Sequence, residues 1–329
     1  MSGHNASVLN ILQVTFPFFA LVLAGYVAAD RRMLPLEAIS GLNSFVLFFA
    51  LPCMLYRFGA GTPIVQLLDA TLFFAYLFCA LLMVGFAIAM SLNARIRWND
   101  AAFGALVAAF PNTGFMGVPL LVALLGTAAA GPAIVTIVCD MVITTSLCIA
   151  LSRLDGADEH GVAKAARSAL RGVLTNPMPW AILLGALSSA LDLELIGPVG
   201  KTVGLLADAA SPVALFTIGA VLARSQIRIK ESGHAPILWR DFLPVALMKL
   251  VLHPILVLLV LTSVRQWGFE LAPFSIMSVV LVAALPSASN VALLSERFEA
   301  DTGRIARIIL VTTAAAFLTF SCAVALLKG

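Results

Sequence analysis

The chain has 329 residues, of which 61% are hydrophobic and 11% are charged, against roughly 45–50% and 25% in a typical soluble domain. So few charges cannot cover a soluble surface of this size, whereas a lipid bilayer accommodates long apolar segments. The composition therefore excludes a soluble protein and predicts an all-α polytopic membrane protein. The net charge of +3 is informative only through the positions of the charges.

A helix needs about 20 mainly apolar residues to cross the hydrocarbon core of a bilayer. The sequence contains ten segments of this kind, separated by short polar stretches. In chain order they are 8–29, 36–56, 64–91, 100–125, 131–152, 176–193, 198–223, 241–264, 273–298 and 304–327.

The basic residues fall mainly on one side of this arrangement. Fifteen of the twenty Lys and Arg residues lie in or beside the loops after odd-numbered spans. The loops after even-numbered spans and the two termini hold only Arg57, Lys201, Arg265 and Lys328. Because positive residues stay on the cytoplasmic side, we expect a multi-pass protein of the cytoplasmic membrane with both termini on the outer side.

The two halves of the chain resemble each other. Pro17 and Gly25 are matched by Pro177 and Gly185, 160 residues later, and Pro52 is matched by Pro212 at the same offset. The segment 107–112 (VAAFPN) is matched by 282–287 (VAALPS) at an offset of 175. Five spans per half invert the second half relative to the first, as in many secondary transporters. We therefore expect repeats at 1–152 and 176–329, joined by a cytoplasmic linker at 153–175.

Spans four and nine each combine a mid-span proline with small polar residues. A proline inside a helix removes a hydrogen bond and clashes with the preceding turn. Irregular backbone at this depth requires burial in protein or a polar cavity, and half-helix N-termini attract anions. We therefore predict that the two breaks meet near the midplane and bind an anion. The predicted site residues are Pro111, Asn112, Thr113, Gly114, Pro286, Ser287, Ser289 and Asn290.

Four motifs resemble the auxin efflux carrier family, which includes the plant PIN carriers and bacterial malonate or dicarboxylate carriers. They are 48–52 (FFALP), 111–120 (PNTGFMGVPL), 176–177 (NP) and 286–290 (PSASN). The resemblance covers essentially the whole chain. Plant PIN carriers have a long central loop, whereas 153–175 is short, which makes auxin a poor substrate candidate.

The resemblance implies ten transmembrane helices in two inverted five-helix repeats, similar to bile-acid sodium symporters. Spans 1, 2, 6 and 7 would form a scaffold and a homodimer interface. Spans 3–5 and 8–10 would form a mobile transport domain, with the broken spans 4 and 9 crossing beside the substrate. The family transports organic anions, in agreement with the site inferred from the two breaks.

Charged residues inside the spans need a reason, because each costs about 2.5–3.5 kcal/mol at the bilayer centre on insertion scales. Asp140, Lys249 and His253 fall near mid-depth in the predicted spans five and eight. One interpretation is a structural ion pair between Asp140 and Lys249. The other is a proton-coupling site at Asp140 and His253, or an electrostatic contribution of Lys249 to anion binding. Asp208, in span seven, is expected to make a helix–helix hydrogen bond.

The sequence therefore predicts a secondary transporter for a small carboxylate such as malonate or malate, with elevator-like alternating access. A proton or sodium ion is the expected coupling partner. An integral-membrane enzyme using Asp140, Lys249 and His253 and an anion channel are the alternatives. No nucleotide-binding loop and no His/Cys cluster is visible, so we expect no enzyme activity, no cofactor and no metal, and nothing indicates nucleic-acid binding.

Overall fold

The computed structural model describes residues 2–62, 69–93, 95–154, 177–231 and 238–328. Most of the predicted linker 153–175 and the start of the predicted third and sixth spans lie outside these residues. Within the described part the chain is helical and contains no strand, apart from one isolated bridge between Pro111 and Ser287. The predicted all-α membrane protein is thus confirmed at this level.

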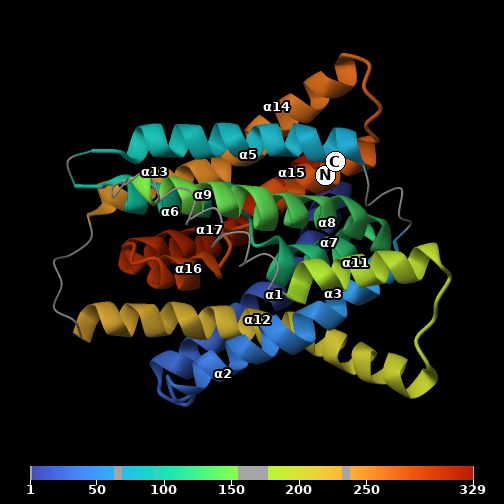
Figure 1. The fold of residues 1–329 in the computed structure, drawn as a ribbon, viewed down its shortest axis with the longest axis horizontal. Helices are drawn as coiled ribbons and strands as arrows, with labels where there is room; N and C mark the ends of the chain where they lie inside the picture. Colours follow the sequence, from blue (N-terminus) through green and yellow to red (C-terminus); the bar gives the residue numbers. More distant parts are fainter. Residues whose placement is uncertain (1, 63–68, 94, 155–176, 232–237, 329) are drawn as a thin grey trace.

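The helices follow one another along the chain with short connections (Figure 1). In the first half they are α1 Ser2–Asp30, α2 Ala38–Phe45, η1 Val46–Ala50, α3 Leu51–Ala60, α5 Ala70–Ser91, α6 Trp98–Ala109, η2 Thr113–Gly117, α7 Val118–Leu125, η3 Thr127–Ala129, α8 Ala130–Val138, η4 Cys139–Thr144 and α9 Thr145–Leu151. In the second half they are α11 Pro177–Ala190, α12 Gly197–Glu231, α13 Trp239–Leu247, η6 Met248–Leu252, α14 His253–Gln266, α15 Pro273–Ala283, α16 Val291–Arg297 and α17 Thr302–Lys328.

Seven helical segments of the described residues are long and apolar enough to cross a membrane. They begin at Gln13, Ala38, Ala70, Thr127, Gly197, Trp239 and Thr302. The other three predicted spans correspond to shorter apolar helices, Thr113–Leu125, Pro177–Ala190 and Pro273–Ala283. Two of these three are short because the chain breaks beside them, at the prolines of spans four and nine. The ten-span count stays a prediction.

Prolines shape several helices by widening a turn instead of ending the helix. The π-helical turns η1, η2 and η6 each end two residues before a proline, namely Pro52, Pro119 and Pro254. The proline ring clashes with the carbonyl four residues earlier, and a π turn moves that carbonyl away. The fourth π turn, η4, has no proline. There the Thr145 hydroxyl donates to the main-chain oxygen of Asp140 (2.8 Å).

Two pairs of helices pack at unusually close range through glycine. An added Cβ on Gly25 of α1 would lie 1.8 Å from the main-chain oxygen of Phe216 in α12. An added Cβ on Gly185 of α11 would lie 2.3 Å from the main-chain oxygen of Tyr56 in α3. Both the glycines and their contact partners are 160 residues apart. One packing arrangement therefore occurs twice, between α1 and α12 and between α11 and α3.

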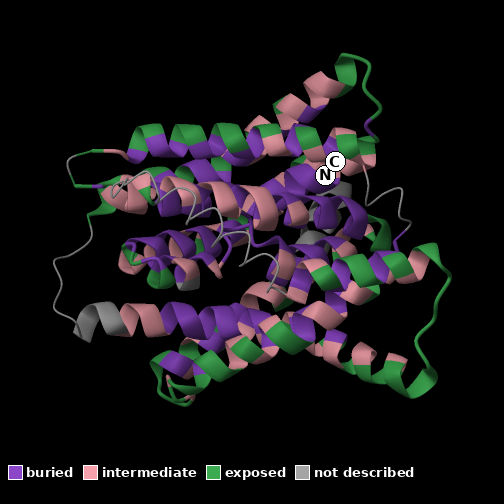
Figure 2. Ribbon diagram, viewed as in Figure 1, coloured by how far each residue is buried: buried purple, intermediate pink, exposed green. Residues whose placement is uncertain are grey.

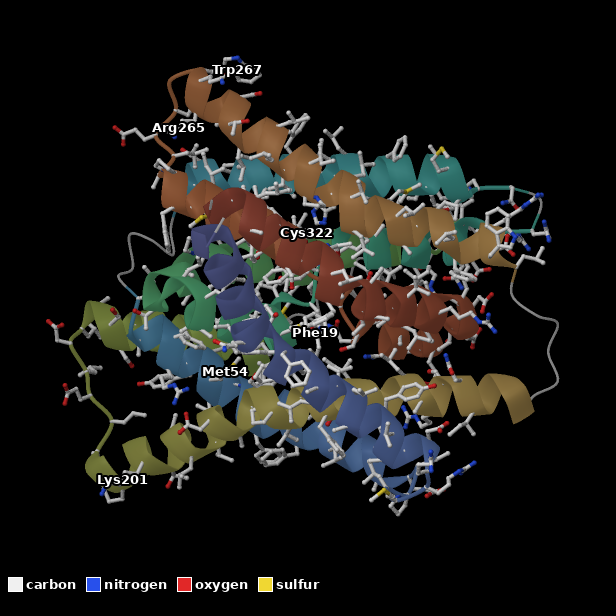
Figure 3. All side chains as sticks on the ribbon, turned by 180° about the vertical axis from the view of Figure 1, so that it is seen from behind. Phe19, Met54, Lys201, Arg265, Trp267 and Cys322 are labelled. Carbon is white, nitrogen blue, oxygen red and sulfur yellow. The ribbon has the colours of Figure 1, made fainter. Side chains whose placement is uncertain are left out.

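Many of the helices run roughly along one direction, and the labels of the two chain ends lie close together, near α8 and α15 (Figure 1). Lys201, Arg265 and Trp267 all lie toward the same end of the molecule (Figure 3). Buried residues fill the middle of the bundle, whereas exposed residues mark the outward faces of α2, α5 and the ends of α11 and α14 (Figure 2). Many exposed side chains are large and apolar, such as Phe74 and Leu205, as expected for surfaces in contact with lipid.

Candidate functional site

The first break separates α6 from η2. Phe110 has extended backbone angles (φ −93°, ψ 104°) because a residue before proline is disfavoured in the helical region. Asn112 is also non-helical (φ −77°, ψ 53°), and the helix resumes at Thr113. The predicted interruption at Pro111 is therefore present, and the resumed helix runs for thirteen residues to Leu125.

The second break separates α15 from α16. The helix ends at Ala283, and residues 284–290 lead to α16, which starts at Val291. Pro286 lies in the middle of this stretch. Because α16 has only seven residues, its N-terminus is a weaker source of positive potential than that of the thirteen-residue segment after Pro111.

The two breaks pair with each other through one isolated antiparallel bridge between Pro111 and Ser287. The Asn112 N–H donates to the Pro286 oxygen (2.8 Å), and the Ala288 N–H donates to the Phe110 oxygen (2.9 Å). The Ser287 N–H donates to the Thr312 hydroxyl of α17 (3.3 Å). We refer to residues 110–112 and 284–290 as the paired breaks. Two broken helices that lie 175 residues apart in sequence thus share one polar contact in the interior.

Not all polar groups of the paired breaks have partners. The buried side-chain oxygens of Asn112, Ser287 and Asn290 lack a hydrogen bond. Within the described residues, the main-chain N–H groups of Gly114, Phe115, Ser289 and Asn290 also have no hydrogen-bond acceptor. Unpaired buried polar groups are uncommon in native proteins and need an explanation, and free N–H groups at a helix start are typical of anion sites.

Three of the predicted site residues have other roles in this geometry. The Thr113 side chain is fully buried and its hydroxyl donates back to the Pro111 oxygen (3.4 Å). Pro111 and Pro286 shape the breaks and offer main-chain oxygens. Gly117, which the site prediction omitted, allows the two breaks to approach: an added Cβ there would lie 2.5 Å from Leu285 Cδ1. In the sequence, only the presence of a glycine at position 117 of the 111–120 motif could have indicated this contact.

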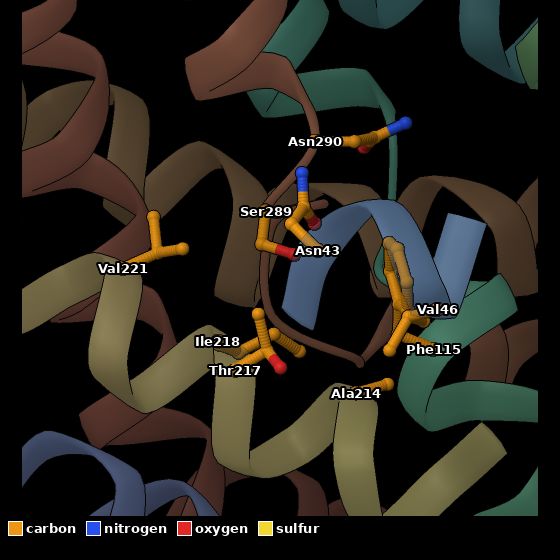
Figure 4. Close-up of a pocket in the computed structure, with 9 residues that line it drawn as sticks. All are labelled: Asn43, Val46, Phe115, Ala214, Thr217, Ile218, Val221, Ser289 and Asn290. Carbon is orange, nitrogen blue, oxygen red and sulfur yellow. The ribbon is translucent and has the colours of Figure 1, made fainter. Parts of the chain in front are cut away.

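Two narrow pockets adjoin the paired breaks, and Phe115 and Asn290 line both. The α12 pocket is lined on its polar side by Asn43, Thr217, Ser289 and Asn290 (Figure 4). The sequence analysis missed Asn43 and Thr217, because a single polar residue in an apolar helix is a weak signal. In Figure 4, the polar lining comes from three separate elements: α2, α12 and the second break.

The second pocket faces α3 and is mostly apolar. Asn112, Gly114 and Asn290 line it together with side chains such as Leu51 and Met178. Each pocket has room for little more than a water molecule. Neither pocket therefore has room for a ligand larger than water while the helices around the paired breaks stay in contact.

Asp140, Lys249 and His253 are fully buried, and they belong to two hydrogen-bonded groups. The Tyr76 hydroxyl donates to Asp140 Oδ2 (2.8 Å), and the Thr144 hydroxyl donates to Asp140 Oδ1 (3.1 Å). Lys249 Nζ lies 3.0 Å from His253 Nδ1 and donates to the Ala283 oxygen (2.7 Å). We refer to Tyr76, Asp140, Lys249 and His253 as the polar array.

The interpretation of Asp140 and Lys249 as a direct ion pair is wrong, because these two residues make the other contacts and no salt bridge joins them. The physical reason is the location of Ala283. It is the last residue of α15, and a helix C-terminus presents carbonyl oxygens that attract a cation. Tyr76 was missed by the sequence analysis, since a tyrosine in an apolar span is usually a packing residue.

Other charges are accounted for by helix contacts. Asp208 accepts a hydrogen bond from Arg57 (2.6 Å), which confirms the predicted helix–helix bond. Arg304 is buried, and its guanidinium donates to the main-chain oxygens of Asp241 (2.7 Å) and Asp100 (2.9 Å). No cluster of three His, Cys, Asp or Glu side chains that could hold a metal occurs among the residues that the structure describes.

Comparison with known proteins gives one family and several relatives. The model of a family described as "Membrane transport protein" matches residues 10–324. The chain is 29% identical over 309 residues to the protein named "Putative malonate transporter" of Rhizobium meliloti (strain 1021), covering 92% of each chain.

Two further relatives are also named as transporters. The chain is 26% identical over 302 residues to "Uncharacterized transporter YfdV" of Escherichia coli (strain K12), covering 87% of this chain and 88% of that one. It is 26% identical over 314 residues to "Uncharacterized transporter" of Methanothermobacter thermautotrophicus, covering 94% of each. The chain is thus a multi-pass membrane protein that belongs to a family of transporters, not enzymes, and this family is the auxin efflux carrier family.

Proposed function

We propose that this transporter is a secondary active carrier of a small organic anion in the cytoplasmic membrane, with a dicarboxylate such as malonate or malate as the substrate. The observation that carries the proposal is the set of unpaired donors at the paired breaks. Four main-chain N–H groups lie where two interrupted helices meet, and the Asn112 and Asn290 amides, whose side-chain oxygens have no partner, lie beside them. The name of the Rhizobium meliloti relative supports malonate as the first anion to test.

The polar groups explain why the ligand should be an anion. The N-terminus of the thirteen-residue segment after Asn112 carries positive potential and free donors. Carboxylate oxygens accept several hydrogen bonds at once, and bonds to a charged group are worth about 1.5–3 kcal/mol each. No acidic residue lies within the paired breaks, so nothing there repels an anion.

The proposed architecture is ten spans in two inverted repeats, 1–152 and 176–329, with both termini outside. The repeated glycine contacts support this arrangement, because equivalent residues make equivalent contacts at one offset. They also support the proposed scaffold, since they join spans 1 and 7 and spans 2 and 6. Antiparallel pairing of the breaks agrees with halves that run in opposite directions.

The proposed mechanism is an elevator-like movement of spans 3–5 and 8–10 past a scaffold that also forms a homodimer. The two pockets support a role in alternating access, because each lies between the paired breaks and the proposed scaffold helices, and Phe115 and Asn290 line both. An anion channel is the second candidate. It would need a continuous polar path, whereas two pockets with little more room than a water molecule favour a carrier.

A ligand panel tests the proposal. Purified protein is heated with malonate, malate, acetate or malonamide, the neutral diamide of malonate. A ligand that binds only the folded state at a hundred times its Kd adds about 2.7 kcal/mol of stability. We expect malonate or malate to raise the melting temperature and malonamide to leave it unchanged. Equal effects of malonate and malonamide, or no effect of any carboxylate, would refute an anion site.

A further inference from the structure

The polar array is bonded directly to one of the broken half-helices. Lys249 Nζ donates to the oxygen of Ala283, the last residue of α15. Ala283 precedes Pro286 by three residues, and three residues of chain reach at most about 11 Å. A change of charge in the array therefore changes the electrostatic potential at the paired breaks, because the two lie close together inside the protein.

The array joins helices from both halves of the chain. Tyr76 lies in α5 and Asp140 in η4, while Lys249 lies in η6 and His253 begins α14. The Tyr76 and His253 rings lie 6.3 Å apart between their centroids, which connects the two hydrogen-bonded groups. Both Asp140 and Lys249 sit in π-helical turns, a local distortion often found at functional sites.

The hydrogen bonding of the array is incomplete. His253 Nε2 is buried and has no partner, although His253 Nδ1 lies next to Lys249. An ammonium group that donates to Nδ1 places the ring proton on Nε2, so the unpaired atom is an N–H. A purely structural polar network would be expected to satisfy all its buried polar atoms, and this array leaves a donor free.

The charges around the array are few. The other titratable side chains near it are Cys79 of α5, Cys139 of η4 and Cys148 of α9, all buried. The neighbouring helices α8 and α15 carry no titratable residue. Among the remaining neighbours, α6 has Asp100 in its first turn, and α13 has Arg240 and Asp241 at its start. In α17, Arg304 is bonded to Asp100 and Asp241 at the end of the bundle. The net charge near α15 is therefore set by Asp140, Lys249 and His253.

We propose that the polar array is the proton-coupling site of this carrier, so that one proton bound there moves together with the anion bound at the paired breaks. This inference rests on the proposed function. A proton from water forms an O–H bond on the Asp140 carboxylate, and the Tyr76 hydroxyl then accepts from Asp140 where it had donated. The positive charge of Lys249 loses its compensating carboxylate, and the array changes from neutral to +1.

The gain of positive charge next to α15 favours an anion. At about 10–14 Å and the effective dielectric of protein sites, one uncompensated charge changes anion affinity on the order of tenfold. Linkage is reciprocal, so a bound anion favours the proton by the same factor. When either the anion or the proton dissociates on the other side of the membrane, the affinity for the other ligand falls. Coupled transport requires this linkage.

The test uses the full-length protein in liposomes loaded with a pH-sensitive dye, with radiolabelled malonate as the probe. Wild type should accumulate malonate when the destination compartment is alkaline, carry protons with it, and be indifferent to sodium. Asp140→Asn mimics the protonated carboxyl, so it should lose pH-driven accumulation and proton movement while exchange of internal for external malonate remains measurable. Asp140→Glu should restore part of the coupling.

The control is Ser278→Ala in α15, whose buried hydroxyl bonds only to the Phe274 oxygen of its own helix (2.8 Å). It should keep coupled uptake. Accumulation that follows a sodium gradient, or full proton coupling in Asp140→Asn, would overturn the proposal while leaving the anion carrier intact. Loss of exchange and accumulation together in a stable Asp140→Asn protein would also overturn it. If the wild-type protein transports no carboxylate at all, the proposed carrier function is wrong, and proton coupling is refuted with it.

Discussion

Replacing Asn112 by leucine separates stability from function at the paired breaks. The Asn112 side-chain oxygen is buried without a partner, and an unsatisfied buried polar group costs about 1–3 kcal/mol. Leucine has a similar shape and removes the unpaired atom. We therefore expect Asn112→Leu to melt at the same temperature as wild type or higher, since replacement of an orphaned polar group by an apolar one is neutral or stabilising.

The same substitution should weaken anion binding. One hydrogen bond from the amide to a carboxylate contributes about 1.5–3 kcal/mol, which corresponds to roughly ten- to hundredfold in Kd. The assay pairs melting temperature without ligand with uptake of radiolabelled malonate. Thr136→Val is the control, because its buried hydroxyl bonds only within its own helix to the Ala133 oxygen (2.8 Å).

The reasoning predicts a more stable and less active protein, a combination that damage to the fold cannot produce. A stable Asn112→Leu protein with wild-type uptake would refute a role for Asn112 in the site. A protein that loses several kcal/mol of stability would show that the side chain is satisfied in the membrane, and that the orphaned oxygen is not a ligand-binding group.

Three further predictions concern the fold. Gly25→Ala should lower the melting temperature strongly, because its Cβ would meet main-chain oxygen at 1.8 Å, whereas Gly41→Ala, with nothing within 4 Å, should have little effect. Arg304→Gln should destabilise the protein by about 3 kcal/mol or more, since buried carbonyl partners lose a charged donor, and a melting curve equal to wild type would contradict this role. In whole cells, a cysteine at Lys201 should react with an impermeant maleimide and one at Arg95 should not; the opposite pattern would reverse the proposed orientation.

Sequence reasoning was strongest where it relied on solvent and backbone chemistry. Apolar length predicted the helical membrane protein, and a mid-span proline combined with small polar residues predicted where two helices are interrupted. It was weaker where the outcome depends on tertiary contacts. The pairing of Asn112 with Pro286 could be expected only from the repeat, and nothing local showed that main-chain bonds would form there.

The charged residues inside the spans show what sequence reasoning could not predict. Mid-depth Asp140 and Lys249 were identified because intramembrane charge is costly, and one of the two interpretations made them an ion pair. Instead, Tyr76 and the end of α15 supply their partners. In the sequence, Tyr76 and Ala283 look like ordinary packing residues, so their hydrogen-bonding roles could not be predicted. The same is true of Asn43 and Thr217 in the α12 pocket.

A structure determined with bromomalonate tests the central claim most directly, because anomalous scattering locates the bromine independently of the protein. We predict a carboxylate within about 2.7–3.2 Å of the Gly114 or Phe115 N–H or of the Asn290 side chain. Bromine located only at lipid-facing surfaces, or beside Lys249 with the paired breaks still closed on each other, would contradict the claim that the interrupted helices bind the transported anion.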